Sequence, residues 1–229
     1  GNSIARRHRH NIKQIEAMIV PSDEISRLSS TLKALFLRWT DFMYSHVRFN
    51  MPDSELHAAA HCERVLLFGL LIGEEQFLDN STAWEILAHA SVFHDTRRFD
   101  EYLDTGHGSR AADYYRDFCG NTTDICYHLE AEYLMRYHDR DDNIGKTAIE
   151  NAFGDDSTSV LQLYDVFKDA DALDRWRLGS YGIDVRYLRT DNARHLLDFA
   201  KRIVEETVPK ELIRHIEQLI IERLNSQER

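Results

Sequence analysis

Apolar residues recur at helical spacing along almost the whole chain, and this periodicity limits the fold more than any other feature of the sequence. No alternating run rich in Val, Ile and Thr predicts a β-strand. The 229 residues include only 3 Pro and 10 Gly, so few positions interrupt a helix. We therefore expect an all-α fold, a single bundle of roughly eight or nine helices.

Capping residues mark where these helices begin. The expected starts are Ser22 after Pro21, Asp53, Ser81 or Thr82, Thr123, Ser157, Asp191 and Pro209. Glycines and Asp/Asn runs place short breaks between the helices, including residues 73–80 and 140–145. No repeat or change in composition divides the chain. We expect a flexible or loosely packed segment over residues 1–20 and one helical domain over residues 21–229.

Charge and hydropathy argue against several classes of partner. Twenty-eight Lys and Arg against 39 Asp and Glu give a net charge of -11, which argues against double-stranded nucleic acid as the main partner. The longest apolar run, residues 65–72, is too short to span a bilayer, and the polar N-terminus lacks the apolar region of a signal peptide. Three cysteines in no metal-ligand spacing, Cys62, Cys119 and Cys126, predict buried structural thiols. We expect a cytoplasmic protein with no membrane partner.

Several of the 12 histidines accompany carboxylates. These histidines and carboxylates are His57, His61, His94 followed directly by Asp95, His107, His138 and Asp171. Imidazole and carboxylate together suit divalent ions of the Mn, Fe, Ni and Zn type, and ligands on several helices can converge inside a bundle. The alternative is a set of buried histidines and aspartates that only hydrogen-bond one another.

Helical phase separates two neighbouring aspartates. Asp171 continues an apolar stripe through Val160, Tyr164 and Phe167 and should be buried, whereas Asp169 continues a polar stripe and should face solvent. An unpaired buried carboxylate costs several kcal/mol, which a bound cation would offset. Asp171 is therefore the preferred ligand.

The same count turns His61 and His138 toward the core, whereas His57 and His89 are interpreted as supporting or structural residues.

The order and spacing of these residues resemble a known family. His61-Cys62-Glu63-Arg64-Val65 looks like an HxxRV helix, His94-Asp95 closes the next helical stretch, and Asp171 lies in KDADALDR. His94 follows His61 by 33 positions and Asp171 follows Asp95 by 76. Over roughly residues 57–177 the chain resembles the HD-domain metal-dependent phosphohydrolases, which implies an HD-type helical domain.

The resemblance implies a metal site. The two His and two Asp that hold one divalent ion in the family correspond to His61, His94, Asp95 and Asp171 here. The implied ion is Mn, Fe, Ni, Zn or Mg. Members with two further histidines can hold a second ion, and His107 and His138 occupy those places here. The alternative is that these two histidines contact substrate phosphate or orient water. Arg64 is expected to pair with a carboxylate near the site.

The implied activity is hydrolysis, in the EC 3.1 class, of a phosphoester or phosphoanhydride of a small phosphorylated molecule, with a nucleotide favoured. Metal-activated water would attack phosphorus, with Asp95 holding that water and His107 or His138 assisting proton transfer. Arg98 and Lys168 are expected to stabilise phosphoryl charge. The alternative is a non-catalytic HD-type module that binds a ligand or a protein partner.

Two departures from the family pattern narrow the substrate. Residues 96–99 lack the acidic residue that follows the HD pair in some guanosine tetraphosphate hydrolases and deoxynucleotidases, and no GYP signature of cyclic-dinucleotide phosphodiesterases follows. These three activities become less expected.

The two C-terminal helices, over residues 191–206 and 209–227, are amphipathic. We expect the stripe of the second helix to pack on the domain. A homodimer interface is the alternative.

Overall fold

The computed structural model describes residues 18–228, and every regular element within them is helical. The nine helices of at least eight residues are α3 (Ser30–His46), α4 (Ala59–Gln76), α5 (Ser81–Phe93), α6 (His107–Gly120), α7 (Leu129–Arg136), α8 (Asp142–Phe153), α9 (Ser157–Leu173), α11 (Leu197–Thr207) and α12 (Lys210–Gln227). Shorter elements are α2 (Ser22–Ser26), α10 (Asp191–His195) and the 3-10 turns η1 (Gly154–Asp156), η2 (Asp174–Leu178) and η3 (Val185–Tyr187). The all-α prediction is confirmed.

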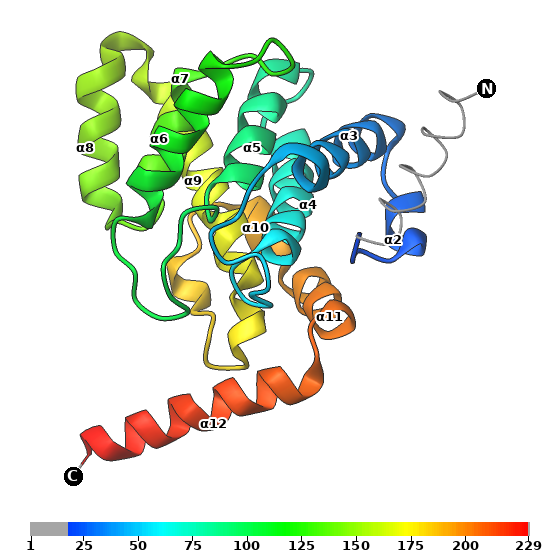
Figure 1. The fold of residues 1–229 in the computed structure, drawn as a ribbon, viewed down its shortest axis with the longest axis vertical. Coiled ribbons are helices and arrows are strands. Elements are labelled where there is room, and N and C mark those ends of the chain that lie inside the picture. Colours follow the sequence, from blue (N-terminus) through cyan, green and yellow to red (C-terminus); the bar gives the residue numbers. More distant parts are fainter. Residues whose placement is uncertain (1–17, 229) are drawn as a thin grey trace.

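Helices α4, α5 and α9 form the centre of the bundle (Figure 1). Helix α4 is buried on nearly every side, since every residue from 61 to 70, which together cover all sides of the helix, is buried. Helix α3 packs on α4 and α5, and α6, α7 and α8 cover the other side, where α7 contacts both α5 and α9 (Figure 1). This arrangement brings the C-terminal end of α5 close to α4, α7 and α9, the helices that carry most of the candidate ligands.

Most of the predicted helix starts agree with the structure. Helices α2, α9 and α10 begin where expected, Pro209 immediately precedes α12, and Asn80 caps α5 by accepting a hydrogen bond from the backbone N–H of Ala83 (3.0 Å). The predicted break at residues 140–145 contains the start of α8, and the one at 73–80 overlaps the end of α4.

Two predicted starts are wrong. Helix α4 begins at Ala59 rather than at Asp53, because the Ser54 hydroxyl accepts from the backbone N–H of His57 (3.0 Å) and makes a local turn. Helix α7 begins at Leu129 rather than at Thr123. Side-chain oxygens near an expected cap can therefore stabilise a turn in place of a helix.

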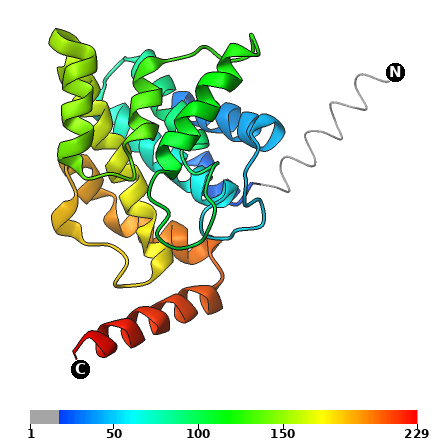
Figure 2. The same cartoon turned by 60° about the vertical axis from the view of Figure 1, so that its left-hand side comes forward.

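The ends of the described chain differ in how they pack. Residues 1–17 of the predicted loose segment lie outside the described residues, but Val20 is buried and its backbone N–H donates to the Glu63 carboxylate (2.7 Å). Helix α12 extends along one end of the bundle (Figure 2), and none of its residues is buried. The prediction that its apolar stripe packs on the domain holds only in part: α12 contacts the short η2 turn, and Leu212, Ile216 and Ile220 are half-buried, whereas Leu219 and Leu224 are exposed.

The three cysteines differ in burial. Cys62 and Cys119 are buried as predicted, whereas Cys126 is exposed. Among residues 18–228, none of the helices has both the length and the apolar character needed to cross a bilayer.

Candidate metal centre

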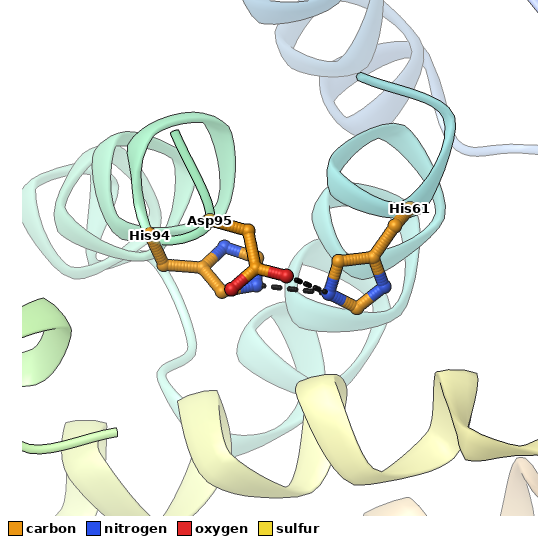
Figure 3. A group of neighbouring side chains, drawn as sticks. All are labelled: His61, His94 and Asp95. Carbon is orange, nitrogen blue, oxygen red and sulfur yellow. Dashed lines mark hydrogen bonds and ion pairs between the residues drawn. The ribbon is translucent and has the colours of Figure 1, made fainter. Parts of the chain in front are cut away.

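Four side chains from three helical segments converge where α5 ends. His61 comes from α4, His94 and Asp95 directly follow α5, and Asp171 comes from α9. The Nε2 atom of His61 lies 3.1 Å from Nε2 of His94, 3.4 Å from Oδ2 of Asp95 and 3.2 Å from Oδ1 of Asp171. His61, His94 and Asp95 point toward one another from neighbouring helices (Figure 3). We call these four residues the first cluster.

A second cluster lies on the other side of Asp95. His107 begins α6 and His138 follows α7, and their Nε2 atoms are 3.0 Å apart. Oδ1 of Asp95 lies 3.0 Å from Nε2 of His107 and 3.5 Å from Nε2 of His138. The two oxygens of Asp95 therefore face different clusters, Oδ2 the first and Oδ1 the second.

All four histidine rings are held by the nitrogen that faces away from the clusters. Each Nδ1 atom lies within hydrogen-bond distance of an oxygen acceptor. The acceptors are Asp174 Oδ2 for His61 (2.6 Å), Ser91 O for His94 (2.8 Å), Asp104 O for His107 (2.5 Å) and Met135 O for His138 (2.6 Å). Since these oxygens only accept, each Nδ1 atom carries a proton, and a ring that is neutral presents the lone pair of Nε2 to the cluster.

Two facing lone pairs need a cation between them. When both rings of a pair are neutral, the distances of 3.1 Å between His61 and His94 and of 3.0 Å between His107 and His138 bring two nitrogen acceptors together without a donor. A proton or a metal ion would remove the repulsion, and imidazole bonds of about 2 Å to zinc-like ions are compatible with this spacing. Several overlapping groups of these buried residues have ligand atoms within 4.8 Å of one another and could hold a metal ion.

The carboxylates of the first cluster are strongly acidic. Burial raises the pKa of Asp95, but the charge of His94 and hydrogen bonds from His107 and His138 lower it by more, so the net pKa lies well below the usual value. Burial likewise raises the pKa of Asp171, and hydrogen bonds from His61 and His94 outweigh that effect. Both side chains are therefore ionised at neutral pH, the form in which carboxylates bind cations.

A buried pair of charges supports the first cluster. Arg64 donates from Nε to Oδ1 of Asp174 (2.6 Å), while Oδ2 of Asp174 accepts from Nδ1 of His61 (2.6 Å). The predicted pairing of Arg64 with a nearby carboxylate is confirmed. Sequence reasoning missed Asp174, although its place three residues after Asp171 is a usable signal. His57 also lies beside the site, with Nδ1 3.4 Å from Oδ2 of Asp95.

The burial of Asp169 and Asp171 in α9 differs from what the helical phase predicts. Asp169 is fully buried, so its predicted exposure is wrong: the backbone N–H groups of Arg189 and Thr190 donate to its carboxylate (3.0 and 2.8 Å). The segment after η3 folds over α9 and supplies these donors. Asp171 is only half-buried, with its side chain 30% exposed, because it opens onto a cavity.

The two predicted phosphate-binding cations have different surroundings. Arg98 is buried, lies 3.3 Å from Nε2 of His107 and donates to the carbonyl of Asp100 (3.2 Å), and within residues 18–228 it has no carboxylate as an ion-pair partner. Lys168 contacts Asp142 (2.7 Å), so its charge is already compensated. Arg98 therefore keeps its charge available beside the second cluster.

Two adjoining cavities open onto the clusters. The first, of about 320 Å³, is lined by His57, Asp95, Arg98 and Tyr102 among others. The second, of about 380 Å³, includes Tyr181 and Tyr187 in its wall. The residues that line both cavities are His138, Asp171 and Arg175. A small molecule in either cavity can therefore reach the carboxylate and imidazole groups.

No protein family, curated protein or solved structure matches the chain. What these residues can bind follows from their donor atoms and from the cavities that they line.

Proposed function

We propose that the chain is a metal-dependent phosphohydrolase that cleaves a phosphoester or phosphoanhydride bond of a small phosphorylated molecule, with a nucleotide as the favoured substrate. The observation that carries this proposal is the arrangement of two pairs of facing Nε2 atoms, 3.1 and 3.0 Å apart, around the two oxygens of Asp95. Two divalent ions that share the Asp95 carboxylate would account for both pairs. A core histidine needs no such arrangement, because ordinary donors and acceptors can satisfy its two ring nitrogens.

The donor atoms fit two ions of the transition series. His61, His94 and Asp171 with Oδ2 of Asp95 would hold one ion, and His107 and His138 with Oδ1 of Asp95 would hold the other. Imidazole nitrogen suits Mn, Fe, Ni and Zn, whereas Mg prefers oxygen ligands and water. A divalent ion at such a site lowers the pKa of a coordinated water to about 7 and polarises a phosphoryl oxygen.

The side chains around the ions have separate tasks in this proposal. Asp95 is ionised and central, so its carboxylate can orient the attacking water. Arg98, next to His107 on the wall of the first cavity, can stabilise charge that develops on the phosphoryl oxygens. Asp174 fixes the ring of His61 and increases the basicity of its Nε2 atom. The open cavities admit the substrate and let phosphate leave.

Hydrolysis of p-nitrophenyl phosphate tests this function. The protein is treated with chelator, dialysed, and assayed with Mn, Fe, Ni, Zn or Mg. We expect chelation to remove activity, at least one ion to restore it, and Asp95→Ala to lower kcat/KM by about a thousandfold or more, because several kcal/mol of transition-state stabilisation are lost.

Asp169→Ala is the matched control, since Asp169 is a buried carboxylate that touches neither cluster. Circular dichroism establishes that both variants are folded. Retained turnover in Asp95→Ala would contradict the proposal. Uptake of metal and nucleotide without phosphate release would contradict it as well and would favour the non-catalytic binding module.

A further inference from the structure

Arg175 differs from the other cations of the second cavity. Among residues 18–228 no carboxylate lies within ion-pair distance of its guanidinium, and its side chain is exposed. Its Nε atom donates to the carbonyl of Gly182, which leaves the other guanidinium N–H groups available. By contrast, Lys168 and Arg189 in the same cavity are both paired with carboxylates. An uncompensated arginine in a cavity is suited to bind phosphate.

Arg175 also lies where the two cavities meet. It lines both of them, as do Asp171 of the first cluster and His138 of the second. A phosphate held by this guanidinium would therefore be next to the residues that we assign to the metal ions. The rest of the substrate would extend into one cavity or the other.

Two tyrosines distinguish the second cavity as the place for a flat aromatic group. Tyr181 and Tyr187 line it, and they are 63% and 72% exposed. Exposed aromatic rings offer stacking faces to a nucleobase, and such stacking typically strengthens binding several-fold to a hundredfold per base. The volume of about 380 Å³ falls in the range of small-molecule sites.

The loop that carries Tyr181 is held against Arg175. Gly182 approaches the backbone carbonyl of Arg175 so closely that a Cβ atom at this position would collide with it. Gly179 has a positive φ of 85°, which favours glycine at the turn before Tyr181. The guanidinium and the tyrosine are therefore presented to the cavity by one tightly packed unit.

We propose that Arg175 and the second cavity bind a nucleoside 5′-phosphate. The guanidinium contacts an oxygen of the scissile phosphate, and the nucleobase lies beside Tyr181 and Tyr187. This inference rests on the proposed function of the same site. It assigns the substrate class, a nucleoside 5′-phosphate, and the cavity that recognises the base. The first cavity is left for water and for the release of phosphate.

Calorimetric titration of the Mn-loaded protein tests the assignment. The probes are the four ribonucleoside 5′-phosphonates, whose carbon–phosphorus bond resists hydrolysis, and the base-free ribose 5-phosphonate. At least one nucleoside phosphonate is expected to bind about tenfold more tightly than the ribose compound. Tyr181→Ala and Tyr187→Ala should reduce this preference, and Arg175→Gln should weaken both classes of probe about equally.

Tyr102→Ala is the matched control, because Tyr102 is an exposed tyrosine of the first cavity, and it should leave the preference unchanged. The inference is overturned if no nucleoside phosphonate binds more tightly than the ribose compound, or if Tyr102→Ala alone removes the preference. Absence of p-nitrophenyl phosphate hydrolysis, together with a base preference that the tyrosine variants lose, would refute the proposed hydrolysis and still support this binding site.

Discussion

Two fully buried histidines, His89 within α5 and His94 at its C-terminal end, differ in the groups that surround their rings. Around His89, the Tyr115 hydroxyl donates to Nδ1 (2.8 Å), and Nε2 has no hydrogen-bond partner among the described residues. Burial and the nearby charge of His128 lower the pKa of His89 to about 3. Around His94, burial lowers the pKa, but Cys62 and Asp95 raise it, and the net pKa lies well above the usual value.

This difference in surroundings shows that burial by itself does not make a histidine a candidate metal ligand. His89 is a neutral core residue that packs its ring against Trp39. His94 turns Nδ1 to a backbone carbonyl and Nε2 toward His61 and Asp171. His89 has one carboxylate, Glu85, at 4.0 Å from Nε2, whereas Nε2 of His94 faces both an imidazole and a carboxylate of the first cluster. The groups that converge on Nε2, rather than depth in the core, separate the two histidines.

The largest expected effect comes from exchanging each of these histidines for Gln. His94→Gln removes a proposed metal ligand and should lower kcat/KM for p-nitrophenyl phosphate by about a thousandfold, whereas His89→Gln should change it less than about threefold. Both variants are assayed with the same added metal, and their folding is checked by circular dichroism. Equal losses in the two variants would remove the distinction between the two histidines.

Metal binding should stabilise the fold through His94 and not through His89. At about a hundredfold excess over its dissociation constant, one bound ion adds about 2.7 kcal/mol, which raises Tm by about 5 to 10 °C. Thermal unfolding with Mn and with chelator measures this shift. The wild type and His89→Gln should show it, and His94→Gln should lose most of it. A shift of the same size in His94→Gln would mean that the ion binds elsewhere.

Two buried aspartates of the same region extend the comparison to supporting residues. Asp174→Asn should weaken metal binding about 10- to 100-fold, because Asp174 orients the ring of His61. Asp169→Asn should leave metal affinity unchanged, since its donors are Arg189 and Thr190. Calorimetric titration with Zn measures both. Comparable weakening by the two substitutions would show that general destabilisation, and not ring orientation, is responsible.

The smallest expected effect is the pH dependence that His89 contributes. Its pKa is about 3 in the folded state and about 6.5 in the unfolded state, so the unfolded chain binds the extra proton as pH falls below 6.5. This neutral histidine therefore costs about 1 kcal/mol of stability between pH 6.5 and 5.5. Urea unfolding of metal-free wild type and His89→Gln measures the free energy of unfolding of both proteins, and between pH 6.5 and 5.5 the wild type should lose about 1 kcal/mol relative to the variant. A constant difference would show that His89 titrates normally in the fold.

Much of the site can be predicted from residue spacing, because the position of a residue in a helix determines which face of the helix carries its side chain. The structure places the predicted residues His61, His94, Asp95, His107 and His138 together, and the predicted burial of His61 and His138 is confirmed. Periodicity carries this information since residues three or four apart share a face. Their roles as ligands stay predictions.

The features that could not be predicted depend on chain segments far apart in sequence. Asp169 is buried by donors about 20 residues later, and no local pattern encodes that cover. The amphipathic stripe of α12 states that the helix has an apolar side but not whether the bundle reaches it. Arg175 follows the predicted ligand Asp171 by four residues, yet its lack of an ion-pair partner among the described residues follows only from the three-dimensional arrangement.

Metal content per chain tests the central claim most directly. Elemental analysis is made on protein purified without chelator and then incubated with Mn, beside Asp95→Ala and His89→Gln. We expect about two equivalents of divalent metal in the wild type and in His89→Gln, and a loss of both in Asp95→Ala, because the two clusters share that carboxylate. No bound metal in the wild type, or the same content in Asp95→Ala, would contradict this claim.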